Sequence, residues 1–345
     1  MYRFECDYTE GCIPEILEAI SRENHTQLQG YSEDTISLRV KAQIKALCGR
    51  TDADVHFLVG GTQANTTVIS AALRPHQGVI SADKGHIACH ETGAIEATGH
   101  KVIALPSDTG RLTARQIREH CAAHYADASF EHIPQPGMVY ISHPAENGSL
   151  YALNELEEIR KACDEYGLFL FLDGARLGYG LMSPATDVTL QDIARLTDVF
   201  YIGGTKVGAL FGEAVVVSHP ALKKDFRYLI KRHGGMLAKG WLLALQFEEL
   251  FKEDRYFKIA KKAVEQAMRI KEAFAKKGCA FLMDSYTNQQ FPILTKSQMA
   301  KFSETYAYSV WEPIDAEHTA VRFATSWATT DEQVAQLVAD IDKFL

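Results

Sequence analysis

The stretch Val199-Phe200-Tyr201-Ile202-Gly203-Gly204-Thr205-Lys206-Val207-Gly208 decides the fold. Its first four residues form an apolar run of buried-strand length, and two glycines, which permit a tight turn, follow them. Lys206 therefore comes just after the end of a buried strand, where an unpaired ammonium group is costly. A Schiff base to an aldehyde cofactor would neutralise the amine, and a lysine on a surface loop is the alternative.

A second stretch favours the cofactor. The apolar run Leu168–Leu172 is followed by Asp173-Gly174-Ala175-Arg176. A carboxylate at the carboxyl end of a buried strand lies where open α/β sheets bind ligands, although a helix N-cap is another common use of aspartate. Pyridoxal phosphate requires a lysine for its Schiff base and an acidic partner for its pyridinium nitrogen. Together, the two stretches favour a pyridoxal phosphate site.

A third stretch is suited to bind an anion. The run Val55–Val59 reads as a strand, and Gly60-Gly61-Thr62-Gln63 follows it before a helix that ends near Leu73. Backbone N–H groups and the helix dipole at such a turn point toward a bound phosphate. An ordinary strand-to-helix connection, with Thr62 as N-cap, is the alternative.

Composition limits the classes of protein. With 345 residues, 46% of them hydrophobic and 23% charged, the chain has the composition of a globular protein that can hold two domains. A net charge of -8 and the lack of a basic cluster do not favour nucleic acid or an anionic membrane as partners. The seven cysteines are scattered without a Cys-x-x-Cys pair, which argues against a zinc site and a disulfide framework. No signal-peptide core is present, so we expect a cytoplasmic protein.

Apolar runs that suit strands alternate with segments of helical periodicity through the first 240 residues. The expected strands are 55–59, 78–81, 101–105, 138–142, 168–172, 199–202 and 214–217, and the expected helices are 14–21, 35–48, 67–73, 113–124, 153–166 and 190–195. Such alternation is typical of an α/β fold with a mostly parallel sheet that helices cover.

The pattern changes after residue 240. A long helical region is expected over 241–277 with a break near Asp254, and then short strands over 280–283, 290–294, 308–311 and 321–323. A closing helix over 331–344 has Thr330 or Asp331 as its cap. We therefore divide the chain into an N-terminal arm (1–30), a large α/β domain (31–240) and a small C-terminal α+β domain (241–345).

The motifs resemble those of one family. The order Gly-Gly-Thr-Gln-Ala-Asn (60–65), His-Ile…Glu-Thr-Gly-Ala (86–94), Asp-Gly-Ala-Arg (173–176) and Gly-Gly-Thr-Lys (203–206) is similar to the low-specificity threonine aldolases. The segments 30–34 and 321–327 fit the same family, so the resemblance covers nearly the whole chain. These enzymes belong to the β-eliminating lyase group of fold-type-I pyridoxal phosphate enzymes. The resemblance implies an aspartate aminotransferase-like large domain with a smaller C-terminal domain.

The resemblance also implies roles for residues around pyridoxal phosphate. Lys206 would form the Schiff base, Asp173 would pair with the pyridine nitrogen, and His86 would stack on the ring. Arg176 would lie near the cofactor 3-oxygen or the substrate. The remaining cofactor contacts would come from Gly61, Thr62, Gln63, Thr205 and Lys239.

On the substrate side, Arg322 would hold the carboxylate of the amino acid with the two-pronged geometry that lysine cannot supply. Asp7, Tyr31 and Arg176 would also contact the substrate. Tyr31 and Lys239 would reach the site across a subunit interface, because enzymes of this family are dimers or tetramers with shared sites.

The implied reaction is the retro-aldol cleavage of a β-hydroxy-α-amino acid such as L-threonine or L-allo-threonine to glycine and an aldehyde. At Glu146 the sequence departs from relatives that carry histidine there, so the base for the hydroxyl proton is open between His86, Glu146 and a water molecule. β-Elimination and aminotransfer are the alternative reactions. A catalytically silent regulatory or scaffold protein of this fold is the alternative outside enzymes.

Overall fold

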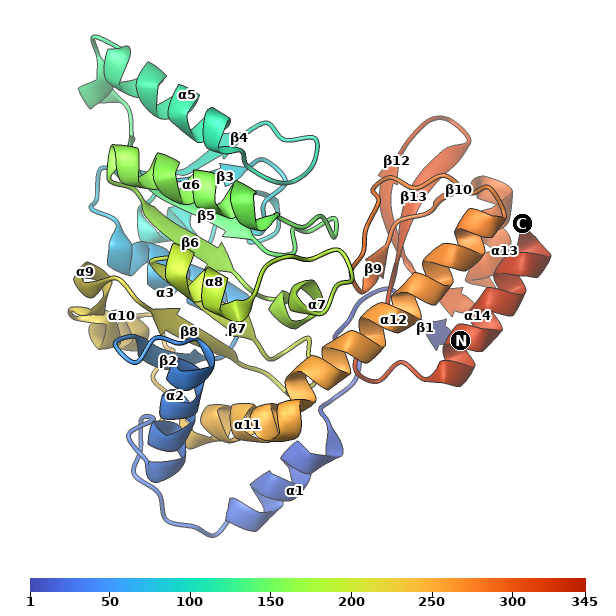
Figure 1. The fold of residues 1–345 in the computed structure, drawn as a ribbon, viewed down its shortest axis with the longest axis horizontal. Helices are drawn as coiled ribbons and strands as arrows, with labels where there is room; N and C mark the ends of the chain where they lie inside the picture. Colours follow the sequence, from blue (N-terminus) through green and yellow to red (C-terminus); the bar gives the residue numbers. More distant parts are fainter.

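The computed structural model describes residues 1–345, and a long helix joins its two parts (Figure 1). The larger part is a seven-stranded sheet with helices on both faces. The smaller part is an antiparallel sheet with two helices packed beside it, and both chain termini lie there. No helix of the chain has the length and apolar character that a membrane crossing needs.

The large sheet has the strand order β2-β8-β7-β6-β5-β3-β4. Strands β3 to β7 run parallel to one another, whereas β8 is antiparallel to both β2 and β7. The strands are β2 (Asp54–Leu58), β3 (Gln77–Ala82), β4 (Val102–Leu105), β5 (Gln135–Ser142), β6 (Phe169–Asp173), β7 (Val199–Gly203) and β8 (Glu213–Val217). The predicted mostly parallel, covered sheet is confirmed.

Successive residues of the strands pack against different helix layers. On β7, Phe200 and Ile202 belong to the larger apolar cluster under α1 (Pro14–Glu23), α2 (Thr35–Leu47), α5 (Ala114–Ala126), α6 (Leu153–Tyr166), α8 (Leu190–Leu196) and α11 (Trp241–Phe251). Val199 and Tyr201 belong to the second cluster, under α3 (Gly61–Ala72), α4 (His86–Cys89), α9 (Pro220–Lys223) and α10 (Phe226–Arg232). The remaining short helices of this part are α7 (Leu177–Leu181), η1 (Glu96–Thr98) and η2 (Phe130–His132).

The predicted break in the long helical region is confirmed. Helix α11 ends at Phe251, a short turn η3 (Lys252–Asp254) follows, and α12 (Arg255–Lys276) leads into the smaller part of the molecule. Glu253 and Asp254 adopt left-handed backbone angles, with φ of 53° and 57°, and this conformation ends the first helix.

The smaller part has its own apolar cluster. It comprises β9 (Gln289–Gln290), β10 (Ile293–Thr295), α13 (Lys296–Ser303), β11 (Tyr306–Ala307), β12 (Ser309–Pro313), β13 (His318–Ala324) and α14 (Asp331–Phe344). The side chain of Thr330 accepts the Gln333 N–H at the start of α14, which confirms the predicted cap. The first strand of the chain, β1 (Tyr2–Arg3), pairs with β11, so the N-terminus lies against this part.

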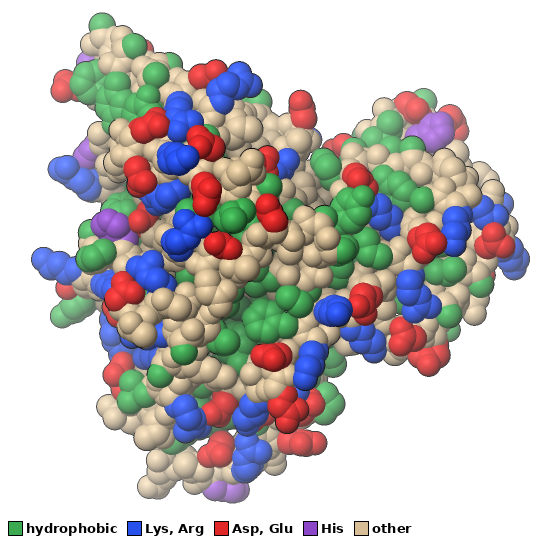
Figure 2. Space-filling view, in the orientation of Figure 1, with side chains coloured by type: hydrophobic (Ala, Val, Ile, Leu, Met, Phe, Trp, Pro, Cys, Tyr) green, Lys and Arg blue, Asp and Glu red, His purple; other side chains and the backbone are tan.

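Two expectations for the smaller part are wrong. Residues 280–283 do not form a strand, because only Phe281 makes a single bridge, to Pro292. The strand expected over 290–294 is split into β9 and β10, with Phe291 and Pro292 between them. Proline has no N–H to donate, so a continuous ladder cannot pass through Pro292. On the face seen in Figure 2, acidic and basic side chains are interspersed over the surface.

Candidate active site

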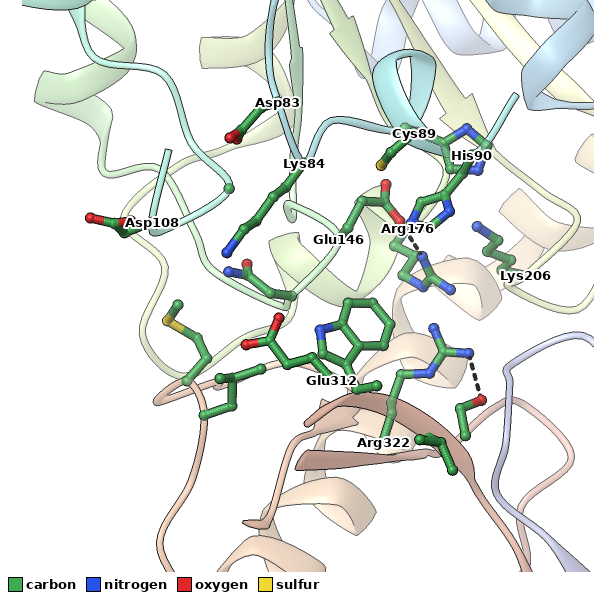
Figure 3. Close-up of a pocket in the computed structure, with 18 of the residues that line it drawn as sticks. Asp83, Lys84, Cys89, His90, Asp108, Glu146, Arg176, Lys206, Glu312 and Arg322 are labelled. Carbon is green, nitrogen blue, oxygen red and sulfur yellow. Dashed lines mark hydrogen bonds and ion pairs between the residues drawn. The ribbon is translucent and has the colours of Figure 1, made fainter. Parts of the chain in front are cut away.

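Four motifs of the sequence meet at one edge of the large sheet. Asp173 ends β6, the turn that carries Lys206 follows β7, and α3 begins just after β2. A cavity of about 760 Å³ opens there, with Arg322 of β13 on the side of the smaller sheet. Figure 3 shows Lys206, Arg176, Glu146 and Arg322 directed into this cavity.

Lys206 has the environment expected of an amine that forms a Schiff base. Burial, followed by the positive charge of Arg176, lowers its pKa from the usual lysine value. Its ammonium nitrogen makes no hydrogen bond or ion pair, and its backbone carbonyl accepts the Tyr179 hydroxyl at 2.6 Å. The preceding turn needs its glycines, because a Cβ on Gly203 would lie 2.4 Å from the Ala175 carbonyl oxygen. The structure therefore holds in the cavity wall an amine with a lowered pKa and no ion-pair partner.

Asp173 is a buried carboxylate fixed by three donors. Its Oδ2 accepts the Tyr140 hydroxyl at 2.5 Å and the Asn65 amide at 3.3 Å, and its Oδ1 accepts the Ala175 N–H at 3.0 Å. No lysine or arginine of the chain forms an ion pair with it. A buried carboxylate without a cation is costly, so a protonated ring nitrogen is a suitable partner.

His86 begins α4 and lines the same cavity. Its Nδ1 lies 2.8 Å from the Glu91 carboxylate, and the Asn65 amide donates to the same carboxylate oxygen at 2.7 Å. Burial lowers the pKa of His86, but the Glu91 hydrogen bond and the negative charges of Glu146, Asp173 and Glu91 together outweigh it, so the net shift of the pKa is upward. Glu91 thus fixes the ring, and Asn65 connects His86 to Asp173.

The first turn of α3 leaves its N–H groups free for an anion. Ala64 donates the first intrahelical bond to Gly60, so the N–H groups of Gly61, Thr62 and Gln63 have no partner in the helix. The Gln63 side chain is engaged with backbone groups of its own surroundings, Val59 and His233. The predicted contribution of this turn is therefore its backbone.

Arg176 is held by a residue at the other end of the chain. Asp7 accepts Nε of Arg176 at 2.7 Å and Nη2 at 3.0 Å, and the Asn288 amide donates to the same carboxylate at 3.0 Å. Burial raises the pKa of Asp7, but Arg176 and Lys206 outweigh it and hold that pKa well below its usual value.

Asp7 is fully buried and does not line the cavity, so its predicted contact with substrate needs correction. Its carboxylate is spent on Arg176, and it orients this guanidinium in the cavity wall.

Arg322 carries a charge that the chain leaves unpaired. Its Nη1 donates to Gln289 Oε1 at 3.2 Å and its Nη2 to the Glu5 carbonyl at 2.6 Å and Ser309 Oγ at 3.3 Å, all neutral acceptors. Its guanidinium carbon lies 5.3 Å from the centre of the Trp311 ring. Burial and the nearby Arg176 lower its pKa, so an anion in the cavity would relieve both costs.

We expect Arg322→Lys to bind pyridoxal phosphate normally but to lose roughly ten- to a hundredfold in kcat/KM for an amino-acid substrate. An ammonium group cannot make the two-pronged contact with a carboxylate, which is worth about 1.5–3 kcal/mol. Steady-state kinetics and a cofactor titration measure the two quantities. Ser309→Ala removes only one neutral contact of Arg322 and serves as the matched control. Unchanged kcat/KM in Arg322→Lys would make Arg322 a structural residue.

Several predicted residues do not line this cavity: Asp7, Gly61, Thr62, Gln63, Asp173, Thr205, Tyr31 and Lys239. Tyr31 is 46% exposed, and its N–H donates to the Ala238 carbonyl at 3.2 Å. Lys239, the next residue, is also exposed, so the two belong to one surface region of the chain. Neither lines the cavity of its own chain.

Several cavity residues have no role predicted from the sequence. They are Tyr8, Asp83, Lys84, Cys89, His90, Asp108, Gly110, Asn147, Leu282, Met283, Ser309, Val310, Trp311 and Glu312. Cys89 and His90 lie within the 86–94 motif, and Asn147 follows Glu146, whereas the residues of β12 lie far from the motifs in sequence. Lys84, Asp83 and Asp108 line the part of the cavity remote from Lys206 (Figure 3).

Lys206, Asp173 and the first turn of α3 fit pyridoxal phosphate. The Lys206 amine, whose pKa is lowered, would bind its aldehyde, and the Asp173 carboxylate, which forms no ion pair, would hold its ring nitrogen. The free N–H groups at the start of α3 would bind its phosphate.

Known proteins are similar to this chain in sequence and in fold. The family model described as beta-eliminating lyase matches residues 7–297. A low specificity L-threonine aldolase of Pseudomonas sp. is 30% identical to this chain, covering 98% of this chain and 96% of the relative. The structure of a Leishmania major threonine aldolase is 43% identical with a TM-score of 0.96, over 99% of each chain. An aspartate aminotransferase mutant of Thermus thermophilus, 13% identical with a TM-score of 0.72 over 100% of this chain and 92% of its own, shares the fold.

Proposed function

Because the chain belongs to the beta-eliminating lyase family, we propose that it is a pyridoxal-phosphate-dependent aldolase that cleaves L-threonine and L-allo-threonine to glycine and an aldehyde. The observation that carries this proposal is one cavity lined by Lys206, whose pKa is lowered, and by Arg322, which forms no ion pair. The first group suits a carbonyl cofactor, and the second suits the carboxylate of an amino acid.

The residues divide the work of the reaction. Bound pyridoxal phosphate supplies the electron sink for the pair released at Cα when the Cα–Cβ bond breaks. Arg322 binds the substrate carboxylate and so selects which bond of Cα can break. Asp173 holds a proton on the ring nitrogen, and Asp7 keeps Arg176 in the wall of the cavity.

We propose Glu146 as the group that takes the proton of the β-hydroxyl. Its carboxylate lines the cavity, 3.6 Å from Nη1 of Arg176. His86 is less suited, because its Nδ1 is bound to Glu91 and its ring is expected to stack on the cofactor. A water molecule bound by Glu146 would act through the same residue.

We expect Glu146→Gln to lower kcat for threonine by roughly 10²- to 10⁴-fold, because the amide accepts no proton. Glycine has no hydroxyl, so its affinity for the variant should stay within a few-fold of the wild type. Stopped-flow turnover and a glycine titration measure these two effects. His86→Asn is the matched control, with a smaller loss of kcat. If the control loses more activity than Glu146→Gln, His86 is the base.

A substrate panel tests the reaction itself. The pure protein, loaded with pyridoxal phosphate, should release glycine and acetaldehyde from L-threonine and L-allo-threonine. Pyruvate release from L-cysteine, or phenol release from L-tyrosine, would favour β-elimination. Production of a 2-oxo acid with transfer of the amino group would favour an aminotransferase. If the protein reacts with none of these amino acids, the result would favour a catalytically silent regulatory or scaffold protein of this fold.

We further propose that the active protein is a homo-oligomer in which Tyr31 and Lys239 complete the site of a neighbouring subunit. Their exposure and proximity support this assignment. Mixing inactive Lys206→Ala with Lys239→Ala would restore activity only if one subunit serves the site of another.

The scattered cysteines support a cytoplasmic location, which cell fractionation tests. Limited proteolysis near residue 240 tests the proposed domain boundary.

A further inference from the structure

Glu213 is a buried acid that none of the steps above uses. It begins β8, and only 3% of its surface is exposed. Its Oε1 accepts the Thr205 hydroxyl at 2.8 Å, whereas its Oε2 is buried without a hydrogen-bond partner. No lysine or arginine forms an ion pair with it. An unpaired buried carboxylate is costly, so the neutral acid is the form that this site stabilises.

The position of Glu213 explains which ligand an acid proton could serve. In the sheet, Glu213 is paired with Leu58 of β2 and with Gly203 of β7. It therefore lies between the strand that leads to the first turn of α3 and the strand that leads to Lys206. A second polar group there, the Tyr201 hydroxyl, is also buried without a partner. A Cβ on Gly61 would come within 3.0 Å of that hydroxyl oxygen, which places it beside the free N–H groups of α3.

Thr205 does not supply a donor at this place. Its hydroxyl donates to Glu213 and accepts the Gly212 N–H at 3.0 Å, so both of its hydrogen-bonding roles are occupied within the chain. The donor that the sequence predicted from Thr205 is thus directed to Glu213, and the free oxygen of Glu213 remains.

We propose that Glu213 is a phosphate-binding residue that stays protonated and donates its Oε2 proton to the phosphate of pyridoxal phosphate. This inference rests on the proposed cofactor. The phosphate ester is a dianion above about pH 7, and a carboxylate in this place would repel it. The contact therefore exists only while Glu213 keeps its proton.

The charged surroundings of Glu213 set the pH range of this contact. Burial raises its pKa and Asp173 adds to this, while the Thr205 hydrogen bond and Lys206 oppose it, and the result is a pKa of about 8. Tyr201 and Tyr256 are the other titratable groups that face it, and burial raises the pKa of both. The first turn of α3 presents no charged side chain. Lys206 titrates as well, but it reacts with the aldehyde, which pyridoxal phosphate and pyridoxal both carry. Its titration therefore affects the binding of both compounds.

The test compares pyridoxal phosphate with pyridoxal, which lacks the phosphate. Both would react with Lys206, so the ratio of their dissociation constants isolates the phosphate contact. The apoprotein is titrated with each compound between about pH 7 and pH 9.5, and bound compound is measured by its visible absorbance. In the wild type, we expect the affinity for pyridoxal phosphate, relative to that for pyridoxal, to fall by about tenfold for each pH unit above the pKa of Glu213.

Glu213→Gln is the matched variant, because its amide keeps the acceptor for Thr205 and a donor that cannot ionise. At about pH 7 it should bind pyridoxal phosphate within roughly threefold of the wild type, and its ratio should stay flat with pH. The same pH trend in wild type and variant, or a change that is equal for both compounds, would overturn the proposal. If the variant does not fold, the wild type alone decides: a ratio of the two dissociation constants that does not change with pH would overturn the proposal. Failure of the wild type to bind pyridoxal phosphate would instead contradict the proposed cofactor.

Discussion

Replacing Lys206 with alanine should abolish the visible absorption that the wild-type protein gains with pyridoxal phosphate. The wild-type amine is buried, has a lowered pKa and forms no ion pair, and each of these features favours attack on the aldehyde. Without this covalent attachment, the cofactor is held only by its phosphate and ring contacts. We expect cleavage of threonine to fall by about 10⁴-fold or more.

Lys84 supplies the matched control for this prediction. It also lines the cavity, but it is exposed and lies at the end remote from Lys206 (Figure 3). Lys84→Ala should keep the visible band. Borohydride reduction of the wild type, followed by peptide mass spectrometry, should find the cofactor on Lys206 alone. A band that survives in Lys206→Ala, or a label on Lys84, would remove Lys206 from its proposed role.

Local sequence patterns were sufficient for most of the large sheet. Helix α6 was predicted with both of its bounds, because Gly167 adopts a left-handed conformation that ends it. The direction of β8 was not predictable, because an apolar run of valines suits a buried strand of either direction. The smaller sheet was the least predictable part, since its strands are short and Pro292 divides one of them.

In the candidate site, the sequence identified the residues that end strands. The structure places Lys206 and Arg176 in the wall of one cavity, and Asp173 at the end of the neighbouring strand β6. It did not identify Tyr140 and Asn65, which support Asp173, or Asn288, which supports Asp7. These partners are separated from the residues they hold by up to 281 positions, and single polar residues in apolar elements have no local pattern. Asp7 was misassigned for the same reason, because the path of the N-terminal arm beneath Arg176 depends on tertiary packing.

The three donors around Asp173 make its charge testable. In Asp173→Asn, the side-chain oxygen can still accept the Ala175 N–H. The new amide nitrogen cannot accept the hydrogen bond from Asn65, and the side chain no longer offers a negative charge to the ring nitrogen. The visible band should remain, because Lys206 is untouched. Turnover of threonine should fall by roughly 10²- to 10³-fold, the cost typical of losing one electrostatic contact that a transition state needs.

A loss of this size in Asp173→Asn could also come from a disturbed hydrogen-bond network, and Tyr140→Phe separates the two causes. That variant removes the donor 2.5 Å from Oδ2 of Asp173 but leaves the charge in place. One such hydrogen bond contributes about 1 kcal/mol, so its turnover should fall less than about tenfold. If both variants lose activity equally, the network matters and the charge does not. If Asp173→Asn turns over normally with its band intact, the ring nitrogen needs no anionic partner, and Asp173 is a structural cap of the turn that leads to Arg176.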